Sequence, residues 1–128
     1  MLSDYVQSAD WKNEKHIPVI LCPDCVQASE PFEIEVTVGK EIPHPNTPMH
    51  FIAWIALHFV PADSHVSIEL GRFEMSAHGA SASGDGGPAI TQSKIKCSVA
   101  LQKPGKLFAT AYCNIHGLWT SEKSVSVR

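Results

Sequence analysis

The chain has 128 residues, of which 44% are hydrophobic and 18% are charged, and its formal net charge is −3. This size and composition are typical of one globular domain with its own core, so we expect residues 1–128 to form a single domain with an N-terminal arm at residues 1–13. The charge balance excludes a strongly basic surface of the kind that binds nucleic acid or an anionic membrane.

The residues after the arm predict β-strands almost throughout. Within the arm, Ser3 and Asp4 favour a short helical turn. Residues 32–38 alternate apolar and polar side chains and end at Gly39, which is typical of a half-buried strand, whereas residues 51–60 are apolar on both faces, as in an inner strand. Further strands are expected at residues 17–21, 66–70 (ending at Gly71), 95–101, 107–112 and 125–127, and the glycine- and serine-rich residues 77–88 predict a mobile loop. About seven short strands indicate an all-β fold, an immunoglobulin-like Greek-key β-sandwich or barrel.

The N-terminus and the cysteines bear on the cellular compartment. Residues 1–7 lack both a basic start and an apolar run, so they do not resemble a signal peptide, and the longest apolar stretch is too short to span a bilayer. We therefore expect a cytoplasmic protein whose four cysteines are reduced, which favours metal binding or catalysis over structural disulfides.

Four histidines and one cysteine lie at the ends of the predicted strands. His16 precedes the strand expected at residues 17–21, His44 and His50 precede the apolar strand, and Cys113 and His116 follow the strand expected at residues 107–112. Loops at one end of a sandwich can bring such residues together. Imidazole and thiolate ligands suit zinc, copper and iron, and structural zinc sites close at four ligands. Five donors leave one open position on a six-coordinate metal, which favours a redox iron that binds a small molecule.

Three segments carry these five residues: EKHIPVI at residues 14–20, VGKEIPHPNT at 38–47 and YCNIHGLW at 112–119. They closely resemble the superoxide reductases of the neelaredoxin/desulfoferrodoxin family, and the similarity extends from Trp11 to Trp119, including residues 71–74 and 77–79. The resemblance implies an immunoglobulin-like β-barrel. It also implies one mononuclear non-haem iron per chain, with the ligands His16, His44, His50, Cys113 and His116. In the implied reaction, superoxide, one electron and two protons give hydrogen peroxide.

The resemblance also implies two catalytic residues. Glu14 would be the sixth ligand of the ferric form, and in an extended segment its side chain would point to the same side as that of His16. Lys15 would place an ammonium group near the open position, where it attracts superoxide. Because one iron stores one electron, a rubredoxin-like donor is expected, and single-domain members of this family form homotetramers.

Two features of the chain bear on which form of the family it resembles. No cysteine precedes Glu14, so the one-iron neelaredoxin form is expected rather than the form with a second, four-cysteine iron site. Met49 and Phe51 flank His50, whereas the family often has an acidic residue before this histidine and a second histidine after it, and this difference could alter the reduction potential.

Other residues allow competing interpretations. Cys22 and Cys25 form a Cys-x-x-Cys pair, but only one further cysteine outside the candidate ligands could complete a four-thiolate site, so we interpret them as thiols at the solvent edge. A cupredoxin-like copper carrier is the alternative function, although it would need a methionine soon after His116 and the chain has none there. An interaction module with incidental histidines is a third. The remaining assignments are a core position for Cys97, an interior or interface position for His58, loop positions for His65 and His78, and core positions for Trp11 and Trp54.

Overall fold

Alternating side chains build a three-stranded antiparallel sheet. The computed structural model describes residues 1–128, and β3 (Phe32–Val38) occupies the predicted range. It lies between β1 (Pro18–Leu21) and β6 (Lys94–Val99), with Val36 opposite both Ile20 and Ile95. Ile34, Val36 and Val38 are buried on one face, while Glu33, Glu35 and Thr37 alternate with them on the more exposed face. The period-two pattern therefore gives this sheet one core face.

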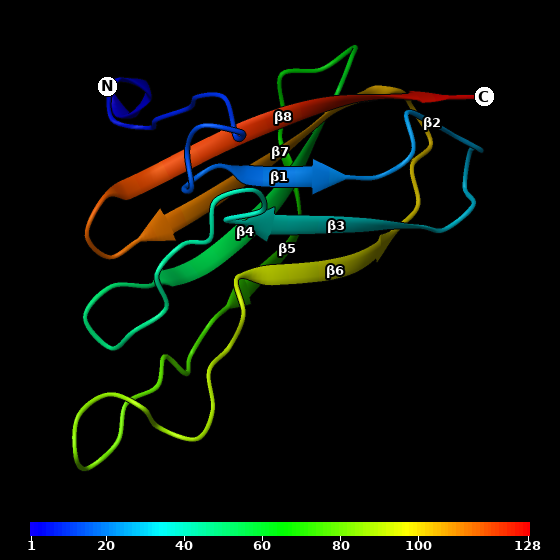
Figure 1. Ribbon diagram of the computed structural model, residues 1–128. Coiled ribbons are helices and arrows are strands. Elements are labelled where there is room, and N and C mark those ends of the chain that lie inside the picture. The colour runs from blue at the N-terminus through cyan, green and yellow to red at the C-terminus, as the bar shows by residue number, and fades with distance from the viewer.

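A second sheet of five strands faces the first (Figure 1). Its order is β2 (Cys25–Val26), β8 (Gly117–Val127), β7 (Gly105–Cys113), β4 (Ile52–Pro61) and β5 (Ile68–Glu74). All its pairs are antiparallel except β2 with β8. Ile55, Leu57 and Leu107 are fully buried between the sheets, where each contributes about 1.5–3 kcal/mol of apolar burial. The all-β sandwich prediction is confirmed.

Several local predictions are wrong in their extent. β8 is much longer than the expected residues 125–127. The prediction missed most of it because the middle of the strand is polar and does not show an alternating apolar pattern. β5 continues through Gly71 instead of ending there. A Cβ atom at residue 71 would lie 2.8 Å from the ring of Phe73, so glycine makes room for that ring. The short β2 was not predicted, and the turn in the arm is a 3₁₀ helix, η1 (Leu2–Asp4).

The two tryptophans predicted in the core lie half-buried outside it. Trp54 stacks on Tyr112 of the neighbouring strand, with ring centroids 5.9 Å apart, and the guanidinium carbon of Arg72 lies 4.1 Å from the Trp54 ring centroid. The ammonium groups of Lys12 and Lys40 lie 5.7 and 5.8 Å from the ring centroid of Trp11. Both indoles instead form cation–π contacts at the surface.

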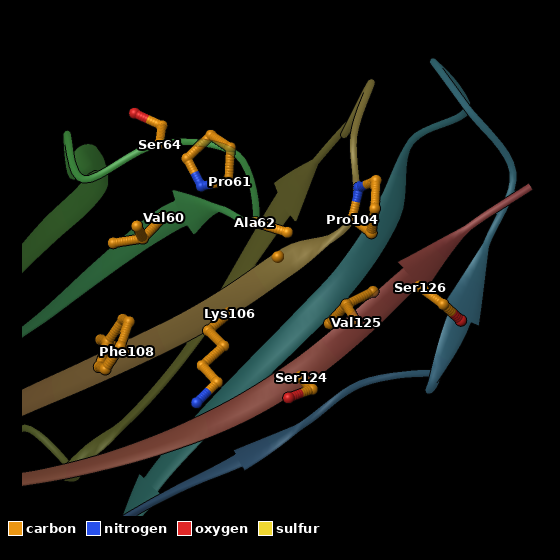
Figure 2. Close-up of a pocket in the computed structure, with 11 residues that line it drawn as sticks. Val60, Pro61, Ala62, Ser64, Pro104, Lys106, Phe108, Ser124, Val125 and Ser126 are labelled. Carbon is orange, nitrogen blue, oxygen red and sulfur yellow. The ribbon is translucent and has the colours of Figure 1, made fainter.

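The two ends of the sandwich differ. At one end, β3 and β7 finish and β1, β4 and β8 begin, so the loops that carry the candidate ligands meet there (Figure 1). At the other end lies a shallow hollow of about 510 Å³ lined by residues that include Pro61, Pro104 and Phe108 (Figure 2). The structure contains no helix with the length and apolar character needed to cross a membrane.

Candidate metal centre

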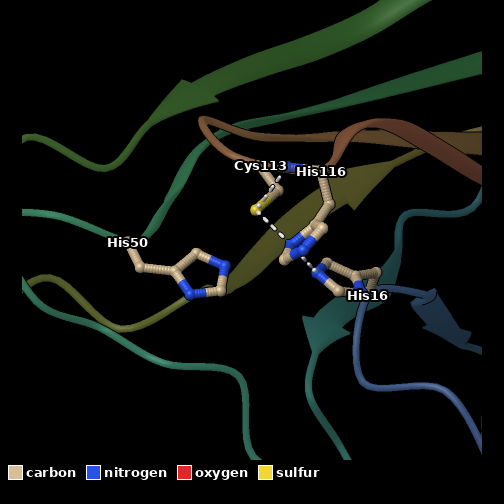
Figure 3. Close-up of side chains that lie close together, drawn as sticks. All are labelled: His16, His50, Cys113 and His116. Atoms are coloured by element: carbon tan, nitrogen blue, oxygen red, sulfur yellow. Dashed lines mark hydrogen bonds between the residues drawn. The ribbon is translucent and has the colours of Figure 1, made fainter.

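Three histidines and one cysteine converge at the loop end of the sandwich. The potential ligand atoms of His16, His50, Cys113 and His116 all lie within 4.8 Å of one another (Figure 3). His16 and His116 are one hundred residues apart in the chain, yet His16 Nε2 lies 3.1 Å from His116 Nδ1. The fold therefore assembles a compact donor group from three separate segments.

His44 completes a ring of four imidazoles. Its ring centroid lies 4.8 Å from that of His16 and 4.8 Å from that of His50. The ring closes through His116, whose centroid lies 5.0 Å from that of His50 and 4.8 Å from that of His16, while His16 and His50 are 6.4 Å apart across it. Four similar sides and a longer diagonal describe a nearly square arrangement, as four equatorial ligands of one metal would require.

Two glycines shape the loops that carry His44 and His116. Gly39, which follows β3, has φ +82°, and a Cβ atom there would lie 2.5 Å from the backbone nitrogen of His44. Gly117, the first residue of β8, has φ +84° directly after His116 and the turn that joins β7 to β8. Both positions need glycine for conformation, and Gly39 also needs it for space.

Two imidazoles are oriented by hydrogen-bond acceptors that lie outside the ring of four histidines. His16 Nδ1 lies 2.6 Å from Glu14 Oε1, and His44 Nδ1 lies 2.7 Å from the carbonyl oxygen of Pro45. Both acceptors hold a proton on Nδ1, so the lone pair of Nε2 points inwards. Bonds of this kind set the tautomer of metal-binding histidines.

Two of the inward nitrogens lack any partner in the protein. The Nε2 atoms of His44 and His50 are buried and accept or donate no hydrogen bond. Buried polar atoms without a partner are rare and call for an explanation. Together with the thiol of Cys113, which is fully buried, these nitrogens form a donor set that fits a bound metal ion.

The cysteine receives a hydrogen bond from its own turn. The backbone N–H of His116 donates to Cys113 Sγ at 3.4 Å, and His116 Nδ1 lies 3.8 Å from the same sulfur. The carbonyl oxygen of His116 accepts from Trp119 Nε1 at 3.2 Å and from Gln7 Nε2 at 3.0 Å. The indole of Trp119 also stacks on His16 at a centroid distance of 4.7 Å. An N–H donor to a ligand sulfur tunes the metal, and the other contacts hold the turn.

Burial favours the neutral form of His16, His44 and His50. It lowers the pKa of His44 from 6.5 to about 4, against the raising effect of the Pro45 carbonyl, and it also lowers the pKa of His16 and of His50. The positive charge of Lys15 contributes a smaller lowering to all three pKa values. Neutral imidazoles are the form that binds metal.

Glu14 does not have the expected geometry. Residues 11–13 and 15–16 form turns rather than an extended segment, and Glu14 Oε1 accepts from the backbone N–H of His16 at 3.2 Å as well as from Nδ1. Burial alone would raise the pKa of Glu14, but these hydrogen bonds outweigh it and lower the pKa below 4.5. In this structure the carboxylate therefore holds the outer nitrogen of His16. Its role as a sixth ligand stays a prediction.

Comparison with known proteins identifies the family. The sequence model described as desulfoferrodoxin matches residues 8–122. The chain belongs to the desulfoferrodoxin family. Neelaredoxin from Megalodesulfovibrio gigas is 45% identical over 128 residues, covering 99% of this chain and 98% of the relative. A crystal structure from Thermotoga maritima, with a TM-score of 0.97 and 45% identity, covers 100% of this chain and 98% of its own. The structure of reduced superoxide reductase (neelaredoxin) from Archaeoglobus fulgidus matches with a TM-score of 0.86 and 47% identity. The match covers 95% of this chain and 98% of the Archaeoglobus chain.

The other cysteines lie away from the centre of this desulfoferrodoxin fold. Cys22 and Cys25 are half-buried free thiols near the opposite end, where Cys25 pairs with Ser126, and burial raises the pKa of Cys22. Cys97 is half-buried and packs against the core rather than within it.

The remaining histidines have partners in the protein or lie at the surface. His58 Nε2 lies 3.5 Å from Glu69, and His65 is exposed. His78 contacts Asn46 Oδ1 at 2.8 Å and stacks on Phe51, with ring centroids 3.8 Å apart.

One residue that sequence reasoning missed lies between two candidate ligands. Asn114, inside the motif of residues 112–119, bonds to the backbone on both sides of His50. Its only signal in the sequence is its position next to Cys113, which does not predict these partners.

Proposed function

We propose that this protein is a superoxide reductase that converts superoxide to hydrogen peroxide at one mononuclear iron. The observation that carries the proposal is the nearly square ring of His16, His44, His50 and His116 beside the buried thiol of Cys113. We assign the ligand atoms as Nε2 of the first three histidines, Nδ1 of His116 and Sγ of Cys113. Five donors leave one position for a small molecule. When bound, ferrous iron supplies the single electron that superoxide requires.

In this mechanism the protein groups orient the ligands and attract the anion. Glu14 Oε1 keeps a proton on Nδ1 of His16, so that Nε2 stays free to bind. The N–H of His116 bonds the Cys113 sulfur and limits how strongly the thiolate donates electron density. Lys15, next to His16 in the sequence, would supply a positive charge beside the open position in a protein whose net charge is −3. A local cation of this kind raises the encounter rate with an anion.

The copper alternative fits this geometry less well. Blue-copper sites use two histidines and one cysteine with a weak axial ligand, commonly methionine. Four imidazoles converge here, two of them with buried and unpartnered Nε2 atoms.

Metal analysis combined with product yield tests the function. We expect the iron-loaded, reduced protein to bind about one iron per chain and to give one hydrogen peroxide for each superoxide consumed, while its iron is oxidised. Dismutation gives only one peroxide for every two superoxides. Stoichiometric copper binding with no peroxide yield would support the carrier, and a lack of metal binding would favour the interaction module.

We further propose that residues 1–128 act as one catalytic domain in the cytoplasm, as a homotetramer that takes electrons from a rubredoxin-like protein. Met49 and Ile115 are 76% and 57% exposed and stand next to His50 and His116, and such apolar surface beside a metal edge suits a small, transient electron-transfer contact. Light scattering measures the assembly. Stopped-flow reduction of the ferric protein by a rubredoxin tests the donor.

Lys15→Ala should slow the capture of superoxide about ten-fold. A unit charge pair about 4 Å apart at an effective dielectric near 20 is worth roughly 4 kcal/mol, and screening leaves about 1–2 kcal/mol of it. Pulse radiolysis at several salt concentrations measures the second-order rate, which should also depend less on salt in the variant. Lys106→Ala, at the distal hollow, is the control and should leave the rate unchanged. An unaltered rate in Lys15→Ala would remove this residue from the mechanism.

Compared at full iron loading, Glu14→Ala should hardly change the capture rate, yet should leave the ferric site open to added azide. The reason is the assigned role of the carboxylate as a ligand in the ferric form, for which Glu14 must leave His16 Nδ1. Loss of the bond between Glu14 Oε1 and His16 Nδ1 should appear separately, as weaker iron binding. Azide titration followed by absorption spectroscopy compares the variant with the parent protein. If azide binds both proteins with the same affinity, Glu14 does not occupy the open position.

A further inference from the structure

Asn114 joins the two loops that carry His50 and Cys113. Its side chain Oδ1 accepts from the backbone N–H of Phe51 at 2.9 Å, and its Nδ2 donates to the carbonyl oxygen of Met49 at 3.0 Å. Its own backbone N–H donates to the carbonyl oxygen of Phe51 at 3.2 Å. All three bonds therefore reach the residues on either side of His50.

These bonds extend the pairing of two strands beyond its regular end. The ladder between β4 and β7 stops at Ile52 opposite Cys113, and its register shifts between Ile52 and Trp54. Beyond that point no regular strand pairing holds the His50 loop against the Cys113 turn. The Asn114 amide supplies one donor and one acceptor in the same plane, which matches the N–H and C=O groups on the two sides of His50.

The His50 loop is also braced within itself and against residues 78–91, where Phe51 stacks on His78 and Asn46 Nδ2 donates to the Thr91 carbonyl at 2.9 Å. His50 N–H donates to the Thr47 backbone oxygen at 3.2 Å and to Thr47 Oγ1 at 3.1 Å, and Thr47 N–H donates to the His50 carbonyl at 3.0 Å. This turn fixes the shape of the loop but not its distance from Cys113. The unpartnered His50 Nε2 faces the thiol group and the His116 ring (Figure 3), so that distance decides whether one ion can reach all three side chains.

We propose that Asn114 is a positioning residue that sets His50 relative to Cys113 and thereby determines metal affinity. The proposal rests on the ligand set of the proposed function. It adds that the asparagine of the Cys113–His116 turn acts through both ends of its amide on a ligand more than sixty residues earlier. Groups that orient metal ligands typically change metal affinity by about 10–100-fold when they are removed.

Two variants remove hydrogen bonds of the Asn114 side chain while changing its size little. Asn114→Leu keeps the size of the side chain and loses both amide bonds, whereas Asn114→Asp keeps the acceptor for Phe51 N–H and loses the donor to Met49. Ser93→Ala is the matched control, because it removes one bond of a half-buried side chain, from Ser93 Oγ to the Val38 carbonyl at 2.9 Å, in a loop that carries no ligand. The probes are Fe²⁺ and Co²⁺, titrated anaerobically against a competing chelator. Thiolate absorption of the Co²⁺ form and thermal unfolding of the metal-free proteins are recorded in parallel.

We expect Asn114→Leu to weaken Fe²⁺ and Co²⁺ binding about 10–100-fold and to alter the thiolate absorption, with Asn114→Asp falling between it and the parent protein. Metal-free Asn114→Leu should unfold near the temperature of metal-free Ser93→Ala, which itself binds metal normally. Parent-like metal affinity and thiolate absorption in Asn114→Leu would overturn the proposal. It would also be overturned if metal affinity fell only in proportion to the unfolding temperature of the metal-free protein, in all variants including Ser93→Ala. A parent protein that binds metal with a thiolate band but reduces no superoxide would refute the proposed function and leave this test valid.

Discussion

Cys113→Ser should reduce superoxide reduction by more than about 100-fold and remove the thiolate absorption of the iron protein. Loss of an outer hydrogen bond to a ligand already costs about 10–100-fold, so loss of the ligand itself should cost more. A serine hydroxyl stays protonated at neutral pH and is a poor substitute for a soft thiolate. Pulse radiolysis measures the rate, and the visible spectrum of the oxidised protein measures the sulfur contribution.

The matched control for this prediction is Cys97→Ser. Cys97 lies in β6, is half-buried and contacts the core, so its replacement tests the cost of losing a thiol outside the centre. It should leave both the spectrum and the rate unchanged. Circular dichroism of Cys113→Ser should retain the strand signal, because Cys113 ends β7 and its backbone pairing with Gly117 does not depend on the sulfur. A thiolate band that survives in Cys113→Ser and disappears in Cys97→Ser would contradict the assignment.

Much of the fold follows from local patterns, and the exceptions have identifiable causes. β3 alternates strictly between core and solvent, and its predicted range is confirmed. In β8, Trp119 and Val125 are buried but the residues between them are polar, so only the last three residues carried a strand signal. At Gly71 the sequence suggested an end, whereas the structure needs glycine there for the Phe73 ring. Strand ends are therefore poorly predicted where a polar or small residue serves packing rather than a turn.

The sequence predicted that the candidate side chains would converge, but not how the imidazoles are oriented. The spacing and chemistry of the motifs made the four histidines and Cys113 candidates, and the fold brings these five side chains together. Their role as ligands stays a prediction. Which nitrogen of each imidazole faces inwards depends on the Pro45 carbonyl and on Glu14, and those contacts exist only in the folded chain. The extended geometry assumed for Glu14 failed because a turn precedes His16. The Asn114 contacts depend on the pairing of segments more than sixty residues apart, which no local pattern reveals.

His44→Leu should lower Fe²⁺ affinity by more than about 100-fold while leaving the metal-free protein at least as stable as the parent. His44 stands outside the tightest donor group, yet its Nε2 is buried without a partner. In the metal-free protein this atom is desolvated and makes no hydrogen bond, which lowers the free energy of unfolding. An apolar replacement removes this desolvation penalty. A histidine kept for structural reasons would give the opposite result, a less stable metal-free protein with normal metal affinity.

The pH dependence of the metal-free proteins sharpens the same test. Burial lowers the pKa of His44 from 6.5 to about 4 in the folded chain, so as pH falls below 6.5 the unfolded chain takes up a proton that the folded chain does not. The parent protein therefore loses stability between about pH 6.5 and pH 4, and His44→Leu lacks this part of the loss. Thermal unfolding across that range should show the advantage of the variant growing as pH falls. His58→Leu, at a histidine paired with Glu69, is the control and should keep the affinity for Fe²⁺. Normal Fe²⁺ affinity in His44→Leu would mean that three imidazoles, not four, hold the iron.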